Sequence, residues 1–175
     1  MNKYKLNVGI VGLGTVGSGV IKLLKKQKRN IKNRTGIELQ VVAISAKNRR
    51  KKRSVNVSSL KWIPSPLDLA KDPNVDVVVE LIGDMDKTAA KVIREAINSG
   101  KHVVTANKSL LAKEGSLFEE LAMQKGVFLR YEAAVAGGIP IIKVLQDSLI
   151  VNKISKLYGV INGTCNFILT KMESD

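Results

Sequence analysis

The stretch VGIVGLGTVGSGVI, residues 8–21, decides the fold of this chain. Its apolar start predicts a strand over residues 8–11, which runs directly into glycines with the spacing G-x-G-x-x-G. After the last glycine, apolar residues recur at helical spacing, and we expect a helix whose last turn is the basic segment of residues 25–29. A strand, a glycine turn and a helix in this order predict the start of a βαβ unit.

Strands and helices alternate along the following sequence. We expect further strands over residues 39–44, 75–82, 102–106 and 127–132, and helices over residues 66–70, 87–98, 110–124 and 137–149. This alternation predicts an α/β fold, a Rossmann-type doubly wound parallel sheet. From residue 153 the sequence begins another strand and then a helix. We therefore expect one domain over residues 1–150 and the start of a second, truncated domain over residues 151–175.

Composition limits the class of protein. The 175 residues suffice for one domain with its own core, and 45% hydrophobic with 25% charged residues fits a globular protein. No apolar run is long enough to span a bilayer, and the polar start resembles no signal peptide, so we expect a cytoplasmic setting. One cysteine excludes an internal disulfide, and a single histidine argues against a zinc site.

The charge of the chain is strongly positive. Lys and Arg number 29 against 15 Asp and Glu, a net charge of +14 at pH 7. Such an excess attracts polyanions, but only 4% of residues are aromatic, and they are not interleaved with basic residues as in base-stacking surfaces. We therefore expect solvated surface lysines, with a phosphate-bearing ligand as a partial cause, and no dedicated nucleic-acid interface.

The glycines stand where a dinucleotide site needs them. Gly12 permits the tight turn, Gly14 leaves space for a pyrophosphate, and Gly17 lets helix and strand pack closely. The phosphates would then meet the free N–H groups at the positive end of the helix. We expect cofactor contacts from Gly12, Leu13, Gly14, Thr15, Val16 and Gly17. The alternative interpretation is a tight turn that binds no ligand.

The end of the second strand bears on which dinucleotide binds. NAD-binding proteins carry Asp or Glu there, about 20 residues after the glycines, to bind the ribose 2′-OH. This chain has Ser45 and Ala46 instead, followed by the basic run KNRRKKRS. We expect Arg49 and Arg50 to pair with a 2′-phosphate, which favours NADP over NAD. A solvated basic loop is the alternative.

Four further motifs accompany GLGTVG (12–17): VVVELIGD (77–84), HVVTANKSLLA (102–112), YEAAVAGGIPII (131–142) and GVINGTCNFILTKM (159–172). Together they resemble the homoserine dehydrogenase family over residues 7–172, most weakly between residues 47 and 66. The resemblance implies reduction of L-aspartate 4-semialdehyde to L-homoserine with NADPH, or NADH in some members. This reaction is a step towards threonine, methionine and isoleucine.

The resemblance also implies roles for single residues. Lys108 matches a lysine at the substrate and nicotinamide. The residues expected along the cofactor before it are Thr105, Ala106 and Asn107. Those that match the hinge into the substrate domain are Asn162, Gly163 and Thr164. A turn that binds a monovalent cation, typically sodium, largely through backbone carbonyls, is matched by Glu132, Val135, Gly137 and Ile139.

The chemistry of Lys108 agrees with this role. Hydride addition to an aldehyde creates negative charge on oxygen, which a nearby cation stabilises and to which it can relay a proton. Lys108 follows a predicted parallel strand, beyond whose carboxyl end ligands bind. Taken without the family, it is equally well a surface lysine in the first turn of a helix. We expect His102 to be structural and Cys165 to pack as a small apolar residue.

Two departures from the family limit the expected activity. Asp84 stands where relatives usually have glycine, and its carboxylate would crowd or repel a cofactor. Family members also continue into a longer substrate domain and, in full length, are expected to form homodimers. We therefore expect this chain to be the cofactor-binding portion, inactive alone. The alternatives are a non-catalytic NADP-binding fragment or truncated paralogue and a basic nucleic-acid-interacting protein.

Overall fold

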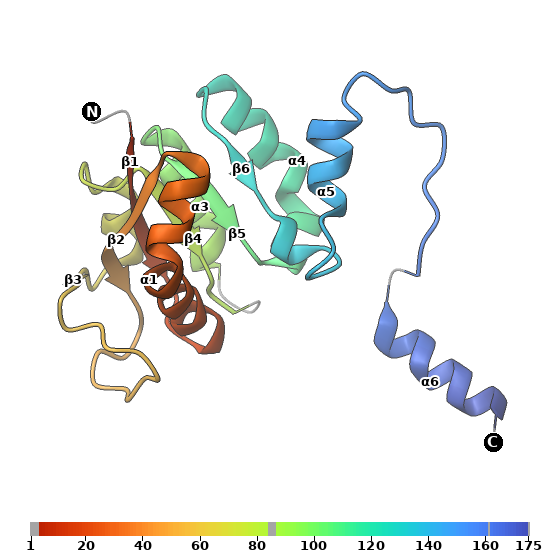
Figure 1. The fold of residues 1–175 in the computed structure, drawn as a ribbon, viewed down its shortest axis with the longest axis horizontal. Coiled ribbons are helices and arrows are strands. Elements are labelled where there is room, and N and C mark those ends of the chain that lie inside the picture. Colours follow the sequence, from red (N-terminus) through yellow and green to blue (C-terminus); the bar gives the residue numbers. More distant parts are fainter. Residues whose placement is uncertain (1–3, 84–86, 161, 175) are drawn as a thin grey trace.

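A computed structural model describes residues 4–83, 87–160 and 162–174. The described residues form one sheet with the strand order β3-β2-β1-β4-β5-β6, and every neighbouring pair is parallel (Figure 1). The chain builds outward from β1 to β3 and then returns to build from β4 to β6 on the other side. The predicted doubly wound parallel sheet is confirmed.

The strands are β1 (Lys5–Val11), β2 (Glu38–Ser45), β3 (Lys61–Trp62), β4 (Val77–Glu80), β5 (His102–Thr105) and β6 (Leu129–Arg130). The α-helices are α1 (Thr15–Thr35), α2 (Pro66–Lys71), α3 (Thr88–Asn98), α4 (Lys108–Gln124), α5 (Ile141–Lys143) and α6 (Gly163–Ser174). A 3₁₀-helix, η1 (Glu132–Ala134), follows β6, and a π-helix, η2 (Val144–Ser148), continues α5.

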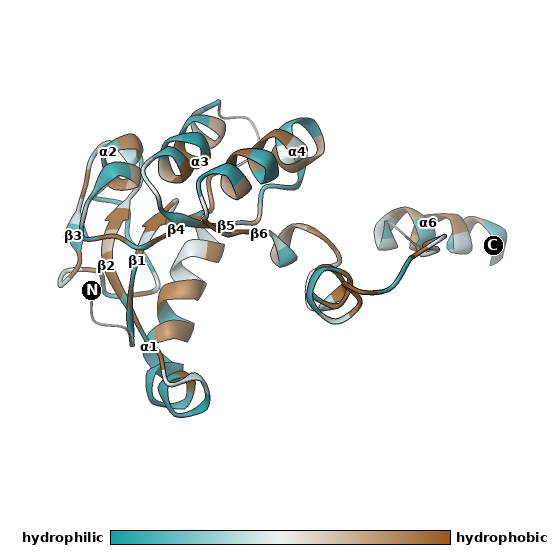
Figure 2. Ribbon diagram, turned by 90° about the horizontal axis from the view of Figure 1, so that it is seen from above, coloured by the Kyte–Doolittle hydropathy of each residue, from teal (hydrophilic) through white to brown (hydrophobic). Residues whose placement is uncertain are grey.

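Helices cover both faces of the sheet. Figure 2 shows α1 on one face and α2, α3 and α4 on the other. Because successive strand residues point to opposite faces, Ile10 packs with Ile21 of α1, whereas Val11 belongs to the cluster on the opposite face. This two-sided burial explains why β4 is almost wholly apolar.

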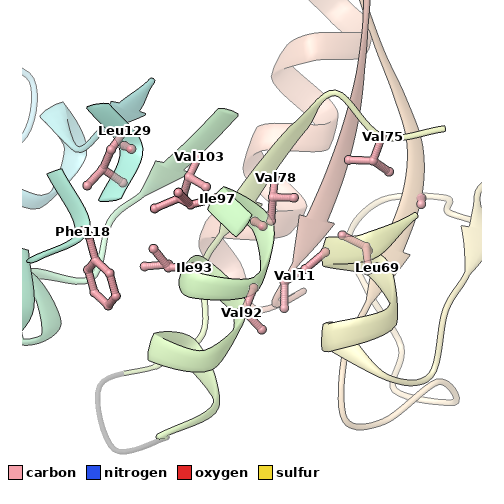
Figure 3. Packing of buried hydrophobic residues seen from close by; sticks show 14 of the residues in the cluster. Val11, Leu69, Val75, Val78, Val92, Ile93, Ile97, Val103, Phe118 and Leu129 are labelled. Carbon is pink, nitrogen blue, oxygen red and sulfur yellow. The ribbon is translucent and has the colours of Figure 1, made fainter. Parts of the chain in front are cut away.

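The larger core cluster lies between the sheet and helices α2, α3 and α4. Val78 of β4 and Val103 of β5 meet Ile93 of α3 and Phe118 of α4 there, and all are fully buried (Figure 3). The 3.6-residue period of the apolar positions in α3 places them on this one face. This cluster therefore packs α2, α3 and α4 against one face of the sheet.

Some predicted boundaries were wrong for identifiable reasons. The basic segment of residues 25–29 lies inside α1, which continues until Gly36 (φ +72°) supplies the left-handed conformation that ends it. The strand expected over residues 127–132 is reduced to two residues at the sheet edge, and the helix expected over residues 137–149 begins only after Pro140. Residues 153–160 form no strand.

The C-terminal segment is set apart from the sheet. In Figures 1 and 2, α6 stands clear of the other helices at the end of an extended connection. Large apolar side chains of this segment are exposed, among them Val151, Tyr158, Phe167 and Met172. The division into residues 1–150 and 151–175 stays a prediction. Among the described residues, no helix combines the length and apolar character needed to cross a membrane.

We expect Phe118→Ala to lower the free energy of unfolding by about 3–5 kcal/mol, because it leaves a cavity in the larger core cluster, where this side chain is fully buried. Urea denaturation followed by circular dichroism measures this change. The matched control is Leu117→Ala in the same helix, whose side chain is 54% exposed and whose loss changes stability by only about 0.5 kcal/mol. Equal losses in both variants would contradict the described core.

Candidate functional site

The candidate site lies at the carboxyl edge of the sheet, where the strand order reverses. Val11 of β1 pairs with Glu80 of β4, and Glu80 pairs with Thr105 of β5, so these three strands end at one level. Gly12 and Leu81, the residues that follow β1 and β4, lie next to each other at this edge. Ligands of open α/β sheets bind in the crevice formed at such a switch point.

Two of the three motif glycines are required by the packing of the protein itself. Gly12 has φ +97°, and a Cβ atom there would overlap the carbonyl of Leu81. Its N–H donates to the carbonyl of Ser45 at 2.9 Å. This hydrogen bond joins the glycine loop, residues 12–14 between β1 and α1, to the end of β2. At Gly17 a Cβ atom would overlap the carbonyl oxygen of Gly12. These glycines allow α1 to start directly over the end of β1.

Gly14 differs from both neighbours in the motif. A Cβ atom at this position would have no atom within 4 Å, so packing does not explain the glycine. Gly14 precedes α1 and offers no side chain to cap it, and the first turn of α1 contains no acidic residue. The positive end of a 21-residue helix therefore faces open space. The arrangement suits an anion that approaches the backbone closely.

A cavity of about 1090 Å³ opens at this helix end. This volume slightly exceeds the range of about 300–1,000 Å³ found for ligand pockets, so the cavity has room for a large ligand. It extends from the glycine loop past residues 64–67 to the start of α3. Of the described residues that line it, none is acidic and four are cationic: Lys47, Lys51, Arg53 and Lys91. The cavity thus matches an elongated ligand that carries several negative charges.

Residues 47–53, the basic loop, contribute to the cavity through cations that differ from the predicted ones. Lys47, Lys51 and Arg53 line the cavity, but Arg49 and Arg50 do not. The Arg49 guanidinium lies over the ring of Trp62 instead, 5.9 Å from its centroid. Arg50 is exposed. Composition alone could not reveal which of these cations line the cavity, because the path of the loop backbone determines where each side chain points.

At the ends of β4 and β5 a buried carboxylate, which was not predicted as a site residue, organises the sheet edge. Glu80 is fully buried; it accepts a hydrogen bond from the Thr105 hydroxyl at 2.6 Å and one from the Ile82 N–H at 2.5 Å. Thr105 in turn accepts from the N–H of Asn107 at 3.0 Å. Glu80 thereby joins the turns after β4 and β5. The available signal was a single acidic residue within an otherwise apolar run.

Lys108 begins α4 directly after this network. The Asn107 side chain accepts a hydrogen bond from the Leu110 N–H at 3.1 Å and so caps the helix. Lys108 itself is exposed, at the same sheet edge as the glycine loop but outside the lining of the cavity. A cation in the first helical turn is disfavoured by the helix dipole, so local stability does not account for it.

The predicted cation turn has a different set of contacts. The Glu132 carboxylate accepts hydrogen bonds from the N–H groups of Ile142 (3.1 Å) and Lys143 (2.8 Å) and so orders the start of α5. The carbonyls of Glu132 and Ile139 each accept one backbone N–H, which leaves each carbonyl a second lone pair. Val135 and Gly137 are exposed.

Tyr131 fixes this turn to α4. Its hydroxyl donates to Glu119 at 2.5 Å and accepts from the Gln146 side chain at 3.2 Å. Burial, followed by the Glu119 carboxylate, raises the pKa of Tyr131 to about 12.

Among the described residues, no three His, Cys, Asp or Glu side chains gather as metal ligands.

The residues predicted for the hinge into the second domain lie away from the cavity. The Asn162 side chain accepts the N–H of Cys165 at 2.9 Å and so caps α6, which begins with Gly163 and Thr164. The structure does not bring these residues to the cavity. Cys165 is exposed, contrary to the expected packing. His102 accepts the Phe128 N–H at 3.0 Å, as a structural residue would. Asp84 lies outside the described residues, so its effect stays a prediction.

Comparison with known proteins adds a family to this geometry. The sequence model described as "Homoserine dehydrogenase, NAD binding domain" matches residues 12–132, and the one described as "Homoserine dehydrogenase" matches residues 140–175. The chain is 41% identical to homoserine dehydrogenase of Bacillus subtilis (strain 168) over 167 residues. This match covers 95% of the chain and 38% of the relative, so the chain spans well under half of that protein.

Solved structures show the same likeness. A homoserine dehydrogenase from Thiobacillus denitrificans superposes with a TM-score of 0.86 at 45% identity, over 98% of this chain and 39% of the other. A hyperthermophilic archaeal homoserine dehydrogenase in complex with NADPH superposes with a TM-score of 0.67 at 25% identity, over 81% of this chain and 48% of the other.

The contrast between the glycines yields a stability test. We expect Gly12→Ala to lower the free energy of unfolding by about 3 kcal/mol or more, because backbone strain and overlap with Leu81 add. Gly14→Ala lowers it by less than about 1 kcal/mol, the effect of a poorer helix cap. Chemical denaturation of both variants measures the difference. A larger loss for Gly14→Ala would show that the space beside Gly14 is not open.

Proposed function

The chain belongs to the homoserine dehydrogenase family, and on this premise we propose that it forms the cofactor-binding portion of an NADP-dependent homoserine dehydrogenase. The proposed reaction is the reduction of L-aspartate 4-semialdehyde to L-homoserine, in the biosynthesis of threonine, methionine and isoleucine. In this proposal residues 1–150 bind the dinucleotide and residues 151–175 begin the substrate domain. A cytoplasmic setting and a homodimer in full length, both expected from the sequence, are part of it.

The observation that carries the proposal is the open space beside Gly14 at the start of α1. Packing requires glycine at positions 12 and 17 but not at position 14, where a close-approaching ligand supplies a reason. The cavity that begins there is lined by cations and by no described acidic residue. A pyrophosphate fits both features, because it is anionic and bonds to backbone N–H groups.

The preference for NADP over NAD rests on the end of β2. Ser45 is buried there, and its hydroxyl donates to the carbonyl of Pro64 at 3.4 Å, so no carboxylate stands ready for a ribose 2′-OH. The basic loop follows at once and places Lys47 and Lys51 along the cavity. Arg49 and Arg50, each next in sequence to a residue that lines the cavity, are proposed to contact the outer side of a 2′-phosphate.

A reduced nicotinamide, when bound, supplies the hydride that the aldehyde carbon receives. The protein has to stabilise the negative charge that develops on the carbonyl oxygen and to provide a proton. Lys108 is proposed for both tasks, because it is a cation at the carboxyl edge held by the capped start of α4. Thr105, Ala106 and Asn107 form the turn that sets its position. Asn162, Gly163 and Thr164 are proposed to reach the substrate from the second domain.

A monovalent cation, sodium by resemblance, is proposed for the turn of residues 132–139. The carbonyl oxygens of Glu132 and Ile139 retain lone pairs, and Val135 and Gly137 contribute further carbonyls in this exposed turn. The Glu132 carboxylate orders the turn through its bonds to α5 and adds negative charge nearby. The reaction steps assigned to Lys108 do not depend on this ion.

We expect isothermal titration calorimetry of this chain to show tighter binding of NADPH than of NADH. Gly14→Ala weakens NADPH binding about tenfold or more, equivalent to ~1.4 kcal/mol, because its methyl group occupies the space of the pyrophosphate. The matched control is Gly19→Ala, also in open space on α1 but outside the cavity, which leaves the affinity unchanged. Binding of neither nucleotide by the folded chain would refute the proposal.

We expect Lys108→Ala, in an active homoserine dehydrogenase that contains this chain, to lower kcat about 10²–10³-fold, as loss of a group that stabilises the developing oxyanion does. The Kd for NADPH changes less than about twofold, because the role arises at the reacting carbon. Steady-state kinetics and calorimetry separate the two effects. Lys113→Ala, an exposed lysine of the same helix, is the control. A kcat of Lys108→Ala equal to that of the parent enzyme would contradict the proposed role of Lys108 at the reacting carbon.

A further inference from the structure

We propose that Arg53 is a positioning residue that determines cofactor specificity. It folds the basic loop around its own guanidinium and so holds Lys47 and Lys51 at the cavity, where they bind the 2′-phosphate of NADP(H). The shape of the loop, and not its total charge, then sets the preference for NADPH over NADH. This inference rests on the proposed function, since it deepens the NADP preference of the same site.

The hydrogen bonds of Arg53 close the loop into a ring. Its guanidinium donates to the carbonyl of Asn48 at 2.6 Å, to that of Lys51 at 2.8 Å and to that of Arg49 at 3.3 Å. From inside the turn, the Asn48 side chain accepts the N–H groups of Arg50 (2.9 Å) and Lys51 (3.1 Å). The forked guanidinium is suited to this task, because it presents several donors in one plane.

Trp62 anchors this ring to the sheet. The Arg53 guanidinium lies over the Trp62 ring, 5.4 Å from its centroid, and Arg49 lies over the same ring. Trp62 belongs to β3, where it pairs with Ile44 of β2, and it packs against the core cluster on the α1 face. Just beyond the loop, Lys25 of α1 donates to the Asn56 carbonyl at 2.8 Å. Arg49 and Arg53 therefore hold the loop against Trp62, and Lys25 holds the segment just after the loop against α1.

Electrostatics gives this anchoring its importance. Six of the seven residues in the basic loop are cationic, and like charges at such spacing repel one another. Carbonyl oxygens around Arg53 offset one of these charges and hold the chain in a tight turn. Lys51 and Arg53 then face the cavity, whereas Lys52 between them is exposed outside it. An unanchored loop of the same composition would present its charges to solvent in many arrangements.

One donor of the Arg53 guanidinium has no acceptor within the loop. Its Nε atom is buried and has no hydrogen-bond partner among the described residues. A buried N–H without an acceptor is unfavourable, and such groups call for an explanation. Nε is buried within the loop, so an anionic ligand would contact the part of Arg53 that lines the cavity, together with Lys47 and Lys51. Preorganisation of Lys47, Lys51 and Arg53 reduces the ordering that binding requires.

The test compares shape with charge by calorimetry of this chain with NADPH and with NADH at one ionic strength. Arg53→Lys keeps the charge but cannot form the fork, and we expect it to lower the NADPH-to-NADH affinity ratio about tenfold. Lys52→Ala removes a charge but keeps the fork, and the ratio stays within about twofold of that of the parent chain. If total charge decided the preference, the two variants would show the reverse order.

A second pair of variants keeps the test decisive if Arg53→Lys does not fold cooperatively. Lys51→Ala and Lys52→Ala remove the same charge from adjacent exposed residues, and only Lys51 lines the cavity. The inference requires a lower NADPH-to-NADH ratio for Lys51→Ala alone. Equal ratios in the two variants, or an unchanged ratio in folded Arg53→Lys, would overturn it while the proposed function stands. A parent chain that binds neither nucleotide overturns both.

Discussion

The close backbone contact between Gly17 and Gly12 is the constraint on which the rest of the structure depends. No side chain fits between these residues, so α1 begins immediately above the end of β1. The helix then directs its positive end into the crevice between β1 and β4. The start of α1 thereby sets the position of the open space beside Gly14 and of the cavity that begins there. It also sets how far this cavity lies from the turn after β5.

A second constraint is the hydrogen bonding of Glu80, which connects the turn after β4 with the end of β5. Glu80 bonds to the turn that follows its own strand and to Thr105 at the end of the next strand. The turn after β4 touches Gly12, and the turn after β5 leads to Lys108. A buried carboxylate is retained only when its oxygens are well bonded, and here the bonds fall on the segments that carry the proposed chemistry. The glycine loop and Lys108 therefore lie on one hydrogen-bonded edge of the sheet.

The doubly wound parallel sheet and the strand–turn–helix at residues 8–21 were predictable from the sequence because their causes are local. Glycine spacing, apolar periodicity and the alternation of elements each concern residues near one another. The inward-facing cations of the basic loop were not predictable, because contacts of Arg53 with Trp62 and three carbonyls decide the path. Residues 153–160 illustrate the same limit: a strand needs a partner strand, and the described chain provides none beside them.

The exposed side chains of the C-terminal segment have a practical consequence. Val151, Tyr158, Phe167 and Met172 present apolar surface to water on an extended connection and on α6. Such surface drives self-association and aggregation when a protein is concentrated. Calorimetric and spectroscopic work on the chain accordingly calls for dilute samples, light-scattering controls and a comparison with a version that ends before residue 151, so that loss of soluble material is not mistaken for loss of fold.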